Sequence, residues 1–102
     1  TNEVTAYYSS DQRLKENIQT IENALEKTLQ LSGITYDRID QPDLPRQTGV
    51  IAQDVMKVLP EVVLGSEDTQ YSVAYGNMVG LLIEAIKEQQ KQIEELKAAI
   101  QK

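Results

Sequence analysis

Residues 75–102 read YGNMVGLLIEAIKEQQKQIEELKAAIQK and form the longest regular stretch of the sequence. They contain no proline, are rich in good helix formers and repeat apolar residues with a period of seven, which predicts one long helix with a coiled-coil seam. The a and d positions of these heptads are Val79, Leu82, Ile86, Gln89, Ile93, Leu96 and Ile100.

The apolar surface of this helix narrows toward its C-terminal end. Between residues 78 and 86 the apolar side chains cover more than a seam, so this part is expected to pack on the rest of the chain. Beyond Glu88 only the seam remains, and a short helix with one apolar stripe is marginal alone, so it needs partner helices. Isoleucine at a with leucine at d favours a parallel dimer, but Gln89 at a d position breaks that rule, so the pattern leaves the number of helices open.

The residues before this helix predict a small module of short helices and strands. Apolar residues at helical spacing give way to alternating β-branched residues and to turn residues, which is typical of an α+β fold. The expected elements are a helix from an N-cap at Thr20 to a stop at Gly33, strands at 34–39 and 48–51 around a loop with two prolines, a helix at 52–59 halted by Pro60, and a hairpin of 62–64 and 69–74 with a four-residue turn.

The fold class is therefore α+β, a mixed helix and strand module followed by a long C-terminal helix. The chain divides into an extended strand at 1–9, the module at 10–74 and the helix at 75–102. The first nine residues resemble the end of something longer.

The composition of the chain removes several chemistries. It has 102 residues and a net charge of −6, and it contains neither histidine nor cysteine. A Ser-His-Asp or Cys-His centre, a Cys/His zinc site and disulfides are therefore excluded. The basic residues form no stripe and the apolar runs are short, so neither nucleic acid nor a membrane is expected as a partner. Because so small a chain buries little surface, oligomerisation is a plausible second source of stability.

No cofactor and no metal are expected. Asp37, Asp40 and Asp43 could suggest calcium, but their spacing lacks the central glycine and terminal glutamate of a calcium-binding loop. A solvated loop is the interpretation favoured for these aspartates.

Three blocks of the sequence together resemble a known family. They are Ser10-Asp11-Gln12-Arg13-Leu14-Lys15-Glu16-Asn17-Ile18, then Gly49-Val50-Ile51-Ala52-Gln53-Asp54-Val55 running to Pro60-Glu61-Val62-Val63, then Tyr71 followed by Leu81 to Gln89. In order and spacing they are similar to the C-terminal intramolecular chaperone domain, of the self-cleaving endosialidase type, of phage tail spikes, tail fibres and neck appendages. The resemblance covers about residues 8–102, and the first block is its most specific part.

The resemblance implies a homotrimer attached to an N-terminal fibre or spike, whose assembly it assists before it removes itself as a serine protease. The scissile bond would be Ser9-Ser10, with Ser10 as the nucleophile and Lys15 as the base. Ser10 rather than Ser9 is chosen because Asp11 follows it directly and Lys15 lies five residues later. The partners implied are two further copies of the chain and its own passenger fibre. The implied location is the host cytoplasm during virion assembly, with the released domain absent from the mature virion.

The residues alone would not establish this chemistry. A lysine in water has a pKa of about 10.4 and is almost entirely charged at pH 7, so a lysine base requires burial or nearby positive charge. Closure of neighbouring chains over the site could supply that environment. Gln53 or backbone amides near Gly49 could stabilise the oxyanion, although a structural role for either is at least as compatible with the sequence.

Two alternatives remain at this point. Taken without the resemblance, Ser10 and Lys15 fit a serine turn followed by a solvated lysine. At the level of the domain, the alternative is a trimerisation or registration module that does not cleave and stays attached to its fibre.

Overall fold

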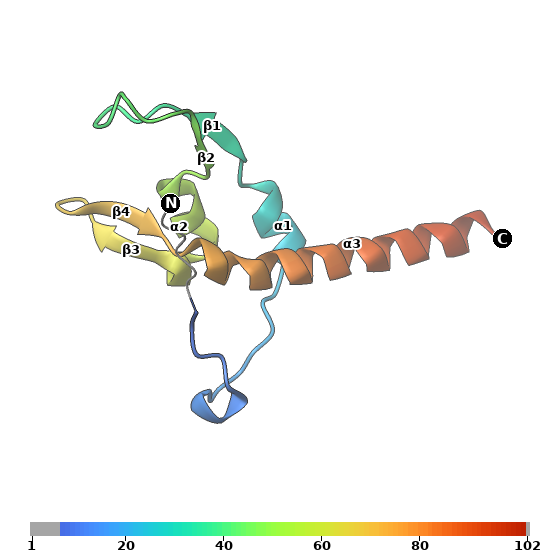
Figure 1. The fold of residues 1–102 in the computed structure, drawn as a ribbon. Coiled ribbons are helices and arrows are strands. Elements are labelled where there is room, and N and C mark those ends of the chain that lie inside the picture. The colour runs from blue at the N-terminus through green and yellow to red at the C-terminus, as the bar shows by residue number, and fades with distance from the viewer. Residues whose placement is uncertain (1–6, 102) are drawn as a thin grey trace.

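The longest element of the fold is the C-terminal helix α3, Val79–Ile100, which starts among the short elements and projects away from them to the C-terminal end in Figure 1. This computed structural model describes residues 7–101. The residues from Tyr75 to Met78, expected to be the start of the helix, instead form a 3₁₀ turn that leads into it. The long C-terminal helix is thus confirmed, with its α-helical part beginning four residues after the predicted start. None of the helices found in residues 7–101 has both the length and the apolar character needed to cross a membrane.

The remaining elements are short, and together with α3 they confirm the α+β class. Two antiparallel strand pairs and two small helices surround the first turns of α3 (Figure 1). The elements are α1 (Ala24–Leu29), β1 (Ile34–Tyr36), β2 (Gln47–Gly49), α2 (Ala52–Val58), β3 (Val63–Ser66) and β4 (Gln70–Val73), with further 3₁₀ turns at Gln12–Leu14 and Pro60–Val62.

The hydrophobic core lies where α1 and α2 meet the N-terminal half of α3. Leu81 and Val55 are completely buried, and Ala85 faces α1 one turn further along α3. The broad apolar surface predicted between residues 78 and 86 therefore does pack on the module. The buried side chains of the core are Ala24, Val55, Val58, Leu59, Val62, Met78, Leu81 and Ala85.

Helix α1 differs from its prediction at both ends. It begins at Ala24, not after Thr20, because Asn23 adopts a left-handed conformation with φ 55° and interrupts the helix. Its cap comes from a distant residue: the Glu88 carboxylate on α3 accepts hydrogen bonds from the backbone N–H groups of Ala24 and Leu25, at 2.9 and 3.1 Å. The helix ends at Leu29, before the predicted stop at Gly33.

The strands are shorter than expected but pair as antiparallel neighbours. Ile34 faces Gly49 and Tyr36 faces Gln47. Strand β1 ends before the predicted residue 39, and β2 begins one residue and ends two residues earlier than predicted. The predicted hairpin is confirmed as β3–β4, but Gly65 and Ser66 continue the first strand, so Ser66 faces Gln70 and the turn has three residues instead of the predicted four.

Helix α2 is confirmed over nearly its whole predicted length. It ends at Val58, and Pro60 then opens a 3₁₀ turn, as its fixed φ and missing N–H favour at such a position. The strand predicted for residues 1–9 falls mostly on residues 1–6, which lie outside the described part of the chain. Tyr7 to Ser9 are described, and within residues 7–101 they do not belong to a strand.

Candidate functional site

Ser10 and Lys15, the two residues singled out as a reacting pair, lie in direct contact. The Lys15 ammonium donates a hydrogen bond to Ser10 Oγ over 2.7 Å. The chain between them folds back as a 3₁₀ turn, in which the N–H groups of Leu14 and Lys15 bond to the carbonyls of Asp11 and Gln12, each at 3.1 Å. A serine hydroxyl within hydrogen-bond reach of a nitrogen base is the geometry that nucleophilic catalysis requires.

Asp11 closes this turn at its N-terminal end. Its carboxylate accepts from the backbone N–H of Arg13 at 2.8 Å and from the Arg13 guanidinium at 2.8 and 3.1 Å. The bonds from the Arg13 side chain and backbone N–H hold the pKa of Asp11 below its usual range. The same carboxylate raises the pKa of the Arg13 guanidinium further above its usual value. The two residues form an ion pair, with Arg13 Nη2 and Asp11 Oδ2 2.8 Å apart.

The site lies on an exposed segment. Ser9, Ser10 and Lys15 are all exposed in the single chain. Figure 1 shows this segment as the dark blue loop standing away from the helices and strands. Several apolar side chains of the segment are also left 68–88% exposed, which is unusual for groups of this size. They are Tyr7, Tyr8, Leu14 and Ile18.

The two candidates for oxyanion stabilisation lie elsewhere in the chain. Gln53 is in the first turn of α2, and Gly49 ends β2, both on the other side of α3 from the dark blue loop in Figure 1. The structure therefore does not bring either to Ser10 within one chain, because the site segment leaves the core in the opposite direction.

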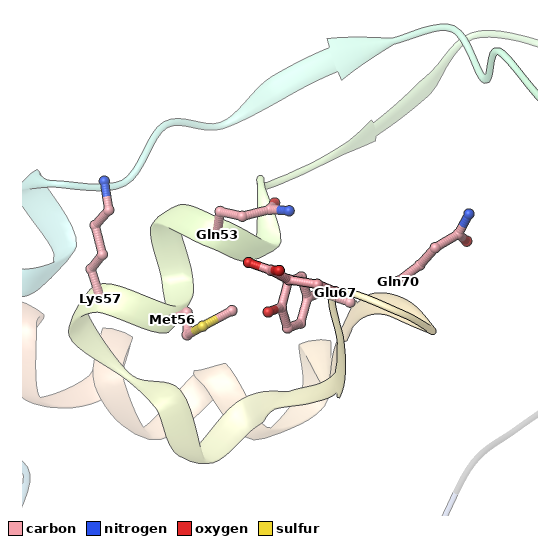
Figure 2. A pocket seen from close by; sticks show the side chains of 6 residues that line it. Gln53, Met56, Lys57, Glu67 and Gln70 are labelled. Carbon is pink, nitrogen blue, oxygen red and sulfur yellow. The ribbon is translucent and has the colours of Figure 1, made fainter.

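Gln53 instead lines an open depression between α2 and the β3–β4 hairpin. Figure 2 shows Met56 pointing from α2 toward the side of the hairpin that carries Glu67, while Lys57 extends away from it. Gly49 has a packing role: a side chain there would collide with the Tyr75 hydroxyl, which accepts a hydrogen bond from the N–H of Val50 at 3.2 Å.

The seam predicted on α3 is exposed in the single chain. Its six apolar members are 44–80% exposed, and Gln89 between them is exposed as well. A neighbouring face of the same helix carries the buried Leu81 and Ala85 and the capping residue Glu88. An exposed apolar stripe along a helix that packs on the module through another face is a surface available for partner helices.

Two of the three aspartates in the 37–46 loop pair with arginines. Asp40 pairs with Arg38, and Asp37 pairs with Arg46 at 3.0 Å. Across residues 7–101 no three His, Cys, Asp or Glu side chains gather closely enough to hold a metal ion.

Sequence reasoning missed Glu88 and the role of Asp11. The sequence marks Glu88 only as the end of the broad apolar surface, and a carboxylate that caps a helix elsewhere in the chain leaves no local signal. Asp11 did carry a signal. Aspartate side chains commonly cap a turn by accepting a hydrogen bond from the backbone N–H two residues further along the chain, as Asp11 does from Arg13.

Comparison with known proteins matches the segment that contains this site. Residues 10–64 match the profile of a peptidase family described as chaperone of endosialidase. The chain is also 35% identical over 106 residues to the long tail fiber protein Gp37 of Enterobacteria phage K3, and 40% identical over 99 residues to that of Enterobacteria phage Ox2. These alignments cover 97% and 89% of this chain but only 8% and 39% of the two relatives, so the chain corresponds to a small part of them. The family match spans more than half of the chain and begins at the Ser10 of the Ser10–Lys15 pair, and it shows that the protein belongs to the chaperone of endosialidase family.

Proposed function

We propose that this chain is an intramolecular chaperone that assists three copies of a phage tail fibre to assemble and then releases itself by cutting the Ser9-Ser10 bond. The observation that carries the proposal is the 2.7 Å hydrogen bond between Lys15 Nζ and Ser10 Oγ, within the segment that matches the family. Residues 1–9 are then the end of the passenger. The work is done in the host cytoplasm during assembly, and the released domain is left out of the virion.

The proposed reaction uses only groups of the chain and one water molecule. Neutral Lys15 takes the proton of Ser10 Oγ, and the oxygen attacks the carbonyl carbon of Ser9. As the carbon–nitrogen bond breaks, Lys15 returns the proton to the nitrogen of Ser10, which leaves an ester between the Ser9 carbonyl and Ser10 Oγ. Water hydrolyses the ester and gives a Ser9 carboxylate and a new N-terminus at Ser10.

Assembly supplies the condition that the single chain lacks. Lys15 is exposed in the single chain, and burial of a lysine disfavours its charged form, so covering of the site by neighbouring copies would activate the base. Association of the chains would bury the exposed seam of α3. The exposed apolar side chains beside the site could likewise be buried against neighbouring copies. Because Gln53 and Gly49 lie away from Ser10 in their own chain, they can stabilise the oxyanion only if they come from a neighbouring copy.

Intact mass of the denatured protein tests the cut directly. We expect a fragment of residues 10–102 from the wild type and from the control Ser9→Ala, and an unbroken chain from Ser10→Ala, Lys15→Ala and Lys15→Arg. Hydroxylamine present during refolding attacks an ester, so it should convert the new Ser9 terminus into a hydroxamate. An unbroken wild-type chain, or cutting that survives Ser10→Ala, contradicts the proposal.

The second candidate is a trimerisation module that does not cut and remains on its fibre. The exposed seam favours it as much as it favours the first, and the relatives are named as fibre proteins. An unbroken chain of trimeric native mass would select this alternative, whereas a dimeric native mass would contradict both.

A further inference from the structure

The Asp11 side chain caps the turn between Ser10 and Lys15, and its hydrogen bonds go to neither of those two side chains. In residues 7–101 all the hydrogen bonds of its side chain go to Arg13: Oδ1 accepts from the backbone N–H at 2.8 Å and from Nε at 3.1 Å, and Oδ2 accepts from Nη2 at 2.8 Å. The backbone of Asp11 is extended, with φ −65° and ψ 132°, as in an N-cap. Asp11 is thus the cap of the turn that lies between Ser10 and Lys15.

The contact between Ser10 and Lys15 depends on that turn. Five residues of extended chain span roughly 17 Å, which would keep the two side chains apart, whereas a 3₁₀ turn rises only about 2 Å per residue. The turn consists of three residues, Gln12–Leu14, and contains no buried side chain. A turn so short, without burial to support it, depends mainly on its cap.

The contact with the guanidinium has a second effect on the site. Arg13 is the other cation of the turn, and its side chain is bound to Asp11 rather than directed at Ser10. Lys15 is therefore the cation that the turn presents to the serine hydroxyl.

We propose that Asp11 is a positioning residue for self-cleavage, which acts by accepting the backbone N–H of Arg13 and so keeping Lys15 against Ser10. This inference rests on the proposed function. It concerns the capping oxygen and not the negative charge, so an asparagine at this position should serve as well as the aspartate.

The test compares first-order cutting rates of the complete chain after refolding, followed by intact mass, with native mass confirming equal assembly. Asp11→Ala removes the capping oxygen and should cut about fivefold more slowly, the equilibrium factor of a typical N-cap. Asp11→Asn retains an oxygen acceptor and should stay within about twofold of the wild type. Arg13→Gln retains its backbone N–H and the cap, so it should also cut at a nearly normal rate.

The outcomes separate this inference from the proposed function. A wild-type chain that never cuts overturns both. A wild type that cuts while Asp11→Ala cuts equally fast overturns the positioning role alone, as does an Asp11→Asn chain as slow as Asp11→Ala. A loss in Arg13→Gln equal to that in Asp11→Ala also overturns it, because the ion pair and not the backbone cap would then control the site.

Discussion

Replacing Glu88 should separate helix α1 from α3. The Glu88 carboxylate accepts two backbone hydrogen bonds at the start of α1, at 2.9 and 3.1 Å, and Asn23 at the cap position offers no side-chain bond of its own. Loss of an N-cap costs about 0.5–2 kcal/mol, and a hydrogen bond to a charged group contributes about 1.5–3 kcal/mol. We expect Glu88→Ala to lower the free energy of unfolding by about 2 kcal/mol, and Glu88→Gln, which retains one acceptor, by about 1 kcal/mol.

Urea unfolding at one fixed protein concentration measures this effect, because any association makes the stability depend on concentration. In a thermal scan, 2 kcal/mol corresponds to a fall in Tm of roughly 10 °C for a domain of this size. Glu95→Ala is the matched control, since Glu95 is exposed on the same helix and its loss should change the stability by less than about 0.5 kcal/mol. The reasoning is refuted if Glu88→Ala and Glu95→Ala unfold at the same urea concentration.

Three further changes test other parts of the fold. Gly65→Ala should lower the free energy of unfolding in urea by about 2 kcal/mol or more, because φ is +102° and a Cβ would meet a backbone carbonyl of β4. Gly33→Ala is the control, since a Cβ there meets open space, and equal stabilities of the two variants would contradict the prediction. Tyr75→Phe should cost about 1 kcal/mol in the same assay by removing the acceptor for a backbone N–H after β2, and an unchanged midpoint would count against that hydrogen bond. The pKa of Asp11, followed by NMR, should lie below its usual value and should rise toward it in Arg13→Gln, which loses the side-chain bonds but keeps the backbone N–H bond. The stability it contributes is therefore present above the usual carboxyl pKa and lost as the pH falls through the lowered one, and a normal pKa in the wild type would contradict the pairing.

The elements that the sequence predicted well are those specified by their own residues. Helix α3 follows from its uninterrupted heptads, and α2 from its apolar spacing and the halt at Pro60. The start of α1 could not be predicted because its cap is contributed by Glu88, 64 positions away from Ala24. Strand β1 ends at Tyr36, before the predicted residue 39. The next two residues form ion pairs within the loop, Asp37 with Arg46 and Arg38 with Asp40, instead of continuing the strand.

The candidate site could be predicted in part for the same reason. The pairing of Ser10 with Lys15 depends on the few residues between them, so its spacing and its turn could be inferred from one short motif. Stabilisation of the oxyanion by Gln53 or Gly49 would require these residues to come from a neighbouring copy of the chain. The heptad pattern of α3 does not specify which residues of two copies come into contact. Their role stays a prediction.

The exposed position of the reacting pair also bears on how such domains diversify. Ser10 and Lys15 bury no surface and stabilise no part of the core, so substitutions there are nearly free of folding cost. If the chain cuts itself as proposed, a lineage can discard or regain the cut while the helices and strands are inherited intact. Under that proposal, substitutions at Ser10 or Lys15 alter cutting without altering the core, so the two properties are open to selection independently of each other.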